Sequence, residues 1–195
     1  RGGGGGPTGG GLGRLRLLSI TAWLVIINAA IFFFQQLFFQ QHFRSGVPDP
    51  LTRYGHFSTD HLIFGIEFWR LLTFQILHAH IWPLQFNMLG LLVFGPMVEG
   101  YLGRRRYLAF YLLCGISGAL LYLVLNLIGA LGVSLPGALN VRTSTPLIGA
   151  SAGVFGVILA CARIEPNRKI MLLFPPVPLK LSWLAIGYVF LALLN

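Results

Sequence analysis

Five apolar runs, separated by short polar segments, constrain the fold of this chain more than any other feature of its sequence. They cover approximately residues 17–39, 82–98, 107–131, 147–164 and 171–195. The first is long enough to cross a hydrocarbon core of about 30 Å. Charged residues make up 10% of the chain, against about 25% in soluble domains. These features exclude a soluble domain and predict an all-α, polytopic transmembrane helix bundle.

The five runs differ in character. The run at 147–164 is short and rich in glycine, so we expect a buried central helix there rather than a lipid-exposed one. The last run is interrupted by prolines near residue 175 and continues to the end of the chain. A mixed polar segment at 40–70 predicts a long loop. Because the chain begins with Arg and stops within an apolar run, we expect it to be a C-terminally truncated piece of a longer protein.

The basic residues predict how the chain is oriented in the membrane. Residues 1–13 are mostly glycine and predict a flexible tail, which leaves 14–195 as the membrane domain. Nine basic residues fall on the side of the N-terminus and four on the other side. Since basic residues concentrate on the cytoplasmic side, we expect a cytoplasmic N-terminus, an external 40–70 loop and a multi-pass protein of the cell membrane. The basic clusters are better explained by orientation than by nucleic-acid binding.

The sequence indicates no metal or cofactor. Cys114 and Cys161 both lie inside apolar runs, where a thiol is typically a small buried hydrophobe. His78 and His80 lack a carboxylate or thiol at a spacing that would complete a metal site.

Three polar positions at membrane depth are candidates for function, since polar groups are costly there. Ser151 lies in the run Gly149-Ala150-Ser151-Ala152-Gly153. This run has two interpretations: a packing motif in which Gly149 and Gly153 form a small-xxx-small pair, or a nucleophile at a helix start whose backbone N–H groups bind an oxyanion. Asn87, taken alone, is typical of an amide that bridges helices. His78, taken alone, is typical of a loop residue at the membrane interface.

Taken together, these positions form a more specific pattern. The run 68–79 (Phe-Trp-Arg-Leu-Leu-Thr-Phe-Gln-Ile-Leu-His-Ala) is followed by Phe86-Asn87-Met88, Gly95, Glu99, Gly103-Arg104, Tyr111 and the glycine-flanked Ser151. In order and spacing, the segment from about 65 to 160 resembles the rhomboid family of intramembrane serine proteases. The resemblance implies six core helices, of which five fall within this chain.

The resemblance also implies roles for individual residues. Ser151 would be the nucleophile of a Ser–His dyad, and Asn87 would join the Ser151 backbone N–H in the oxyanion hole. His78 would brace the loop and helix start, Gly149 would support the site as the glycine of the Gly-x-Ser motif, and Phe155 would stack on the catalytic imidazole. The family carries this histidine on the sixth core helix, so we expect it beyond residue 195 and expect the 195-residue chain itself to be inactive.

One position departs from the family pattern. Members commonly carry a second histidine five residues after the first, where this chain has Pro83. Proline is acceptable at a helix start but offers no donor to an oxyanion.

The leading hypothesis is therefore an intramembrane serine endopeptidase that cleaves transmembrane protein substrates without a cofactor. The alternative is a catalytically inactive rhomboid-like protein that binds client transmembrane helices. A channel or transporter is disfavoured, because such proteins need charges within their spans and the spans here hold almost none.

Overall fold

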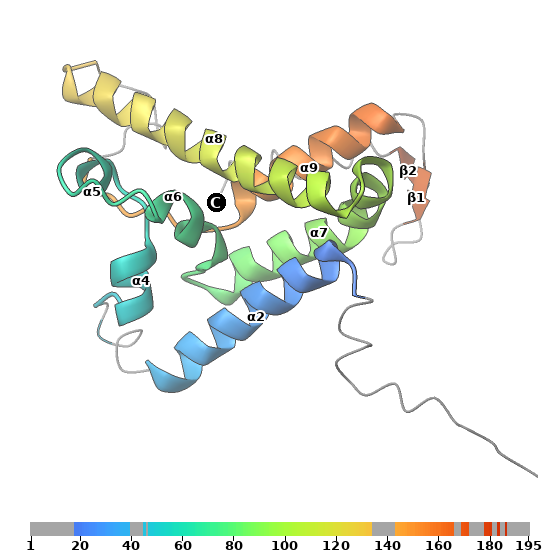
Figure 1. The fold of residues 1–195 in the computed structure, drawn as a ribbon, viewed down its shortest axis with the longest axis horizontal. Coiled ribbons are helices and arrows are strands. Elements are labelled where there is room, and N and C mark those ends of the chain that lie inside the picture. The colour runs from blue at the N-terminus through green and yellow to red at the C-terminus, as the bar shows by residue number, and fades with distance from the viewer. Residues whose placement is uncertain are drawn as a thin grey trace, which may run out of the picture.

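The computed structural model describes residues 18–39, 45, 47–133, 143–165, 169–171, 178–180, 183 and 186. Over these residues the chain is mostly helical (Figure 1). The elements are α2 (Ile20–Phe38), α4 (Pro50–Gly55), α5 (Thr59–Ile63), α6 (Arg70–Thr73), the 3-10 helix η1 (Phe74–Ile76), α7 (Ile81–Leu102), α8 (Arg104–Ala130), α9 (Ser151–Ile164), β1 (Lys169–Met171) and β2 (Pro178–Lys180).

The long helices confirm the predicted class of fold. Among the described residues, α2, α7 and α8 are long and apolar enough to cross a membrane. The shorter α9 packs against both α7 and α8, and its residues Val154, Val157 and Ile158 are fully buried. A buried, central fourth helix is what its glycine-rich sequence predicted. Most of the expected fifth run, and the 1–13 tail, lie outside the described residues.

Small side chains allow α8 and α9 to approach closely. A Cβ atom added to Gly118 of α8 would lie 2.5 Å from the Cβ of Ala152 on α9. One added to Gly153 of α9 would lie 2.7 Å from the Tyr111 ring on α8. Neither distance is tolerable for a real methyl group, so glycine sets the separation of these two helices.

A buried carboxylate attaches the start of α2 to α7. The two oxygens of Glu99 accept hydrogen bonds from the backbone N–H groups of Ile20 at 2.7 Å and Thr21 at 2.9 Å. The first N–H groups of a helix have no partner within it and carry partial positive charge. Glu99 satisfies them, which explains why an acidic residue is tolerated on an otherwise apolar span.

The polar segment between α2 and α7 is more ordered than the predicted loop. Its two short helices, α4 and α5, are each capped by a side chain: Asp49 accepts from the N–H groups of Leu51 and Thr52, and Ser58 from that of His61. The expectation of a plain loop over 40–70 was wrong in this respect.

The short antiparallel β1–β2 hairpin was also not anticipated from the sequence. Its register sets Lys169 opposite Lys180. It lies near the end of α9 (Figure 1) and leaves the helical class of the fold unchanged.

Candidate functional site

Ser151 is the first residue of α9. The first hydrogen bond of this helix runs from the Val154 N–H to the carbonyl oxygen of Ala150, at 3.0 Å. The N–H groups of the three residues before Val154 therefore have no acceptor within the helix. A helix start of this kind concentrates donors and partial positive charge around the Ser151 hydroxyl.

Gly149 lies before the helix, not on it. Its backbone has φ of 129°, a region that favours glycine, and its N–H donates to the Phe74 carbonyl oxygen at 2.9 Å. The interpretation of Gly149 and Gly153 as a helical packing pair is therefore not what the structure shows. Gly153 alone packs against α8, whereas Gly149 shapes the turn that leads into Ser151.

The Ser151 side chain is half-buried. Within the described part of the chain, no residue forms a hydrogen bond with its hydroxyl oxygen, and none of the described histidines is bonded to it. Phe155 follows one helical turn later and is also half-buried. Residues at i and i+4 share a helix face, so the Phe155 ring lies on the side of α9 that carries Ser151.

Asn87 and His78 form a buried polar pair beside this helix. The Asn87 amide Nδ2 lies 3.1 Å from Nε2 of His78, and both side chains are at most 4% exposed. Asn87 lies in the second turn of α7, and His78 lies in the connection just before that helix. Because α7 packs directly on α9, the fold brings together the two elements that carry Asn87 and Ser151.

The protonation of His78 follows from its burial. Burial lowers the pKa of His78 to about 4, so its ring is neutral near pH 7. Nε2 of the neutral ring accepts from the Asn87 amide, and Nδ1 then carries the proton. This hydrogen bond restrains the rotation of the Asn87 amide; the expected role of His78 in bracing the loop and the helix start stays a prediction.

Pro83 occupies the first turn of α7 and is exposed, as is His80, which precedes the helix. Proline fits this turn without loss because the first N–H groups of a helix are unpaired. Proline in place of the second histidine of the family pattern therefore does not disturb the helix, but the position supplies no hydrogen-bond donor.

The segment that precedes Ser151 is held by the polar region between α2 and α7. Phe57 and Leu147 exchange backbone hydrogen bonds of 3.0 and 2.7 Å. Together with the bond between Gly149 and Phe74, this bridge holds the chain at two points just before α9 begins. The position of Ser151 therefore depends on contacts with residues far away in the sequence.

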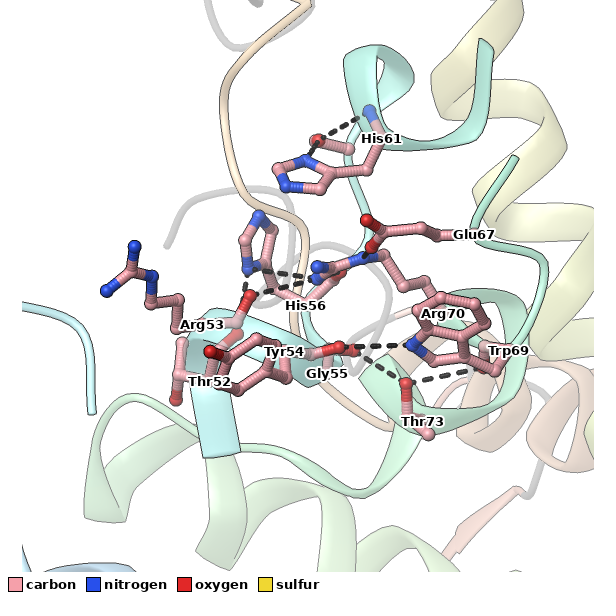
Figure 2. Close-up of polar contacts among 11 residues, drawn as sticks. Thr52, Arg53, Tyr54, Gly55, His56, His61, Glu67, Trp69, Arg70 and Thr73 are labelled. Carbon is pink, nitrogen blue, oxygen red and sulfur yellow. Dashed lines mark hydrogen bonds and ion pairs between the residues drawn. The ribbon is translucent and has the colours of Figure 1, made fainter. Parts of the chain in front are cut away.

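Arg70 organises that polar region (Figure 2). Its side chain is 3% exposed; it is ion-paired through Nε with Glu67, and Nη1 donates to the carbonyl oxygens of Arg53 at 3.1 Å and His56 at 2.7 Å. The guanidinium thereby satisfies carbonyl groups at the end of α4 that have no partner in that helix.

Trp69 and Thr73 add to the same set of contacts. Nε1 of Trp69 donates to the Tyr54 carbonyl oxygen at 3.3 Å, and Oγ1 of Thr73 donates to that of Gly55 at 2.8 Å. Sequence reasoning used Trp69 as a motif residue and Arg70 as a motif residue and one of the four basic residues on the outer side, and it missed this structural role. One feature of the sequence could have indicated this role: Glu67 lies three residues before Arg70 in an aromatic segment, a spacing that allows an ion pair.

His56 contributes a second neutral imidazole to this region. Its Nδ1–H donates to the Thr52 carbonyl oxygen at 2.7 Å. Burial, more than the neighbouring Arg70 and His61, lowers the pKa of His56 below its usual value. The described residues contain no group of three or more potential metal ligands.

Comparison with known proteins identifies one family and several relatives by sequence similarity. Residues 65–195 match the family model of the Rhomboid domain. The chain is 36% identical over 112 residues to the Rhomboid protease GluP of Bacillus subtilis, covering 57% of this chain and 19% of that protein. It is 31% identical over 101 residues to the mitochondrial Rhomboid protein 1 of Saccharomyces cerevisiae, covering 52% of this chain and 26% of that protein.

The matched segments thus span about a fifth to a quarter of the length of these curated relatives. No solved structure matches the chain significantly.

Proposed function

The chain belongs to the rhomboid family of intramembrane proteases, and from this membership we propose that the full-length protein is a serine endopeptidase that cleaves transmembrane protein substrates. The observation that supports this most is the placement of Ser151 at the start of α9, where the N–H groups of the first helical turn are unpaired within the helix. A hydroxyl so placed combines a potential nucleophile with potential oxyanion donors.

In the proposed reaction, the Ser151 hydroxyl attacks the carbonyl carbon of the scissile peptide bond. Its proton passes to a histidine that lies beyond residue 195. The oxygen of the tetrahedral intermediate accepts hydrogen bonds from the Ser151 backbone N–H and from the Asn87 amide. The amine product leaves with the proton held by the histidine, and water then hydrolyses the acyl-enzyme ester.

His78 and Gly149 support this reaction without touching the substrate. His78 holds the Asn87 amide in one rotamer through the 3.1 Å hydrogen bond. Gly149 permits the turn that brings Ser151 to the helix start. We propose that Phe155 stacks on the catalytic imidazole, since it shares a helix face with Ser151.

Substrates should be transmembrane helices that unwind easily near the cleaved bond. A peptide bond within a helix is shielded by its own hydrogen bonds, and glycine, proline or polar residues weaken that shield. We further propose that residues 14–195 belong to the membrane domain, with residues 1–13 as a cytoplasmic tail and the polar region between α2 and α7 outside the cell membrane.

A cleavage assay tests this function. Full-length wild type, Ser151→Ala and Ser117→Ala are purified, reconstituted in liposomes and given a transmembrane substrate that an active family member cleaves alongside. Ser117 is a matched control, because it is exposed on α8 and its hydroxyl donates only to the Leu113 carbonyl oxygen of its own helix. We expect Ser151→Ala to lose at least about a thousandfold in kcat and Ser117→Ala to retain the wild-type rate. Equal rates for wild type and Ser151→Ala would exclude the proposal.

The position of Pro83 favours one alternative, a rhomboid-like protein that binds client helices without cleaving them. Pro83 removes a side chain that could donate to an oxyanion. If the alternative holds, wild type and Ser151→Ala both fail to cleave and both retain the same transmembrane client after purification.

A further inference from the structure

A groove opens at the end of the bundle where α7 ends, α8 begins and α9 ends. Its volume is about 510 Å³, and it is lined by Tyr101, Leu102, Phe110, Ala160, Arg163 and Ile164. Figure 1 shows these three helix ends converging near the β1–β2 hairpin. The groove lies at the opposite end of α7 from Asn87 and His78, so it is separate from the candidate catalytic site.

The groove combines an apolar interior with a basic rim. Four of its lining residues are apolar (Leu102, Phe110, Ala160 and Ile164), while the Arg163 side chain is exposed at its edge. Arg106 lies one helical turn before Phe110 and is exposed as well. Residues four apart share a helix face, so Arg106 lies on the side of α8 that lines the groove.

The charges around this end do not cancel. Among the described residues at or next to the ends of α7, α8 and α9 near the groove, four are basic (Arg104, Arg105, Arg106 and Arg163) and two are acidic (Glu99 and Glu165). The Glu99 carboxylate already binds the backbone at the start of α2. The two carboxylates carry one negative charge each against the four positive charges of the arginines, so the rim of the groove has a net positive charge.

The depth of the groove in the membrane defines what it can bind. Because α7 and α8 meet here at the ends of their apolar spans, the groove lies at the boundary between hydrocarbon and headgroups. Tyr101 is 71% exposed on its rim, a position typical of tyrosine at a membrane interface.

We propose that this groove binds one molecule of an anionic phospholipid from the adjacent leaflet. An acyl chain occupies the apolar interior, and the headgroup phosphate contacts the guanidinium groups of Arg163 and Arg106. A free phosphate ion would leave the apolar walls exposed, and an uncharged lipid would leave the arginines without an anion. Basic pockets between transmembrane helices are known to select anionic headgroups.

Native mass spectrometry of the full-length protein tests the proposal. The protein is held in detergent micelles that contain increasing amounts of phosphatidylglycerol or phosphatidylcholine, and the lipid that stays bound after release from the micelles is measured. We expect wild type to retain one phosphatidylglycerol in preference to phosphatidylcholine. Arg163→Gln should weaken the retention of phosphatidylglycerol about tenfold, because charge-assisted contacts to phosphate are among the stronger hydrogen bonds. Arg163→Lys should lose less, since it keeps the charge.

Two further variants separate the site from general charge attraction. Arg105→Gln removes one charge from the same turn of α8 but lies roughly 140° around the helix from Phe110, so we expect wild-type retention. Ala160→Phe fills the groove without changing charge and should reduce retention as much as Arg163→Gln. This variant also carries the test if Arg163→Gln does not fold.

Three results would overturn the proposal: equal retention of the two lipids by wild type, equal losses in Arg163→Gln and Arg105→Gln, or full retention in Ala160→Phe. Ser151→Ala should bind the lipid as wild type does, so failure of the proposed protease activity would leave this test unaffected.

Discussion

At the scale of single residues, the pair formed by Asn87 and His78 links burial to a candidate catalytic role. Burial keeps the imidazole neutral, and a neutral Nε2 can accept the amide hydrogen that orients Asn87. Protonation would turn that acceptor into a donor and break the contact. The orientation of the amide therefore depends on His78 staying uncharged.

Replacing Asn87 with Ala tests the proposed oxyanion contact. We expect kcat to fall roughly 100- to 1,000-fold, with KM nearly unchanged, since one oxyanion donor acts mainly in the transition state. The measurement is steady-state cleavage by the full-length protein. Asn126→Ala is the matched control: it removes another buried amide, which donates to Oγ1 of Thr59 on α5, and should leave kcat within a few-fold of wild type. Comparable losses in both variants would mean that Asn87 acts only through stability.

The lowered pKa of His78 predicts how stability depends on pH. The unfolded chain takes up a proton near pH 6.5, whereas the folded chain does so only near pH 4. Between these values the unfolded state binds more protons, so stability falls as the pH decreases. At pH 5, the free energy of unfolding should be lower by about 2 kcal/mol because of His78.

Thermal unfolding of the full-length protein at pH 7 and pH 5 measures this effect. We expect His78→Gln to show a smaller drop in midpoint than wild type, with the remainder owed partly to His56, whose pKa is also lowered. His80→Gln, at an exposed position, should behave as wild type. A His78→Gln drop as large as the wild-type drop would contradict the assignment.

At the scale of elements, the start of α9 is determined by its neighbours more than by its own sequence. Its apolar periodicity and glycines predicted the helix and the close contact with α8. The run around Ser151 left open whether the serine lies within the helix or begins it. The answer depends on the backbone hydrogen bonds that Gly149 donates to Phe74 and that Leu147 exchanges with Phe57, two residues that are distant in sequence and invisible to a local pattern.

Other elements escaped prediction for similar reasons. The helices α4 and α5 are five or six residues long, too short to show an apolar period. The partners of Arg70 lie up to 17 residues away and are mostly backbone carbonyl groups, which carry no sequence signal. The contact between Glu99 and Thr21 joins residues 78 apart. The sequence therefore predicted the four apolar helices α2, α7, α8 and α9 that the structure describes, but not the contacts that position them, and the roles of the candidate site residues stay predictions.

The close contact of α8 and α9 predicts opposite effects for two glycine substitutions. Gly153→Ala places a methyl group against the Tyr111 ring and should destabilise the protein by about 1–3 kcal/mol. Gly100→Ala, on α7, meets no atom within 4 Å and should stabilise the protein by about 0.5–1 kcal/mol, since alanine favours a helix. Denaturant unfolding of both variants measures the two effects. A Gly153→Ala variant as stable as wild type would show that packing does not set the spacing of α8 and α9.

At the scale of the whole molecule, the ends of the helices separate two chemical environments. The proposed catalytic residues lie toward the end that carries α4, α5 and α6, whereas the arginines of the proposed lipid groove lie at the other end. Arg70, counted among the external charges, is buried in an ion pair with Glu67. Because Arg70 is buried in this pair, it adds no exposed charge at the end that carries the proposed catalytic residues, and the difference in charge between the two ends is larger.

Cysteine labelling tests the orientation that this asymmetry predicts. In a full-length background with Cys114 and Cys161 changed to Ala, the exposed positions Tyr54 and Arg105 are each replaced by Cys. We expect a membrane-impermeant maleimide to label Tyr54→Cys in intact cells and Arg105→Cys only after permeabilisation. The reverse pattern would place the N-terminus outside.

The central claim is that the Ser151 hydroxyl is a nucleophile. Its most direct measurement is labelling of the full-length protein in native membranes with a serine-reactive fluorophosphonate, which needs no knowledge of the substrate. We expect strong labelling of wild type and of Ser117→Ala, and none of Ser151→Ala. Labelling of Ser151→Ala at the wild-type level would contradict the account.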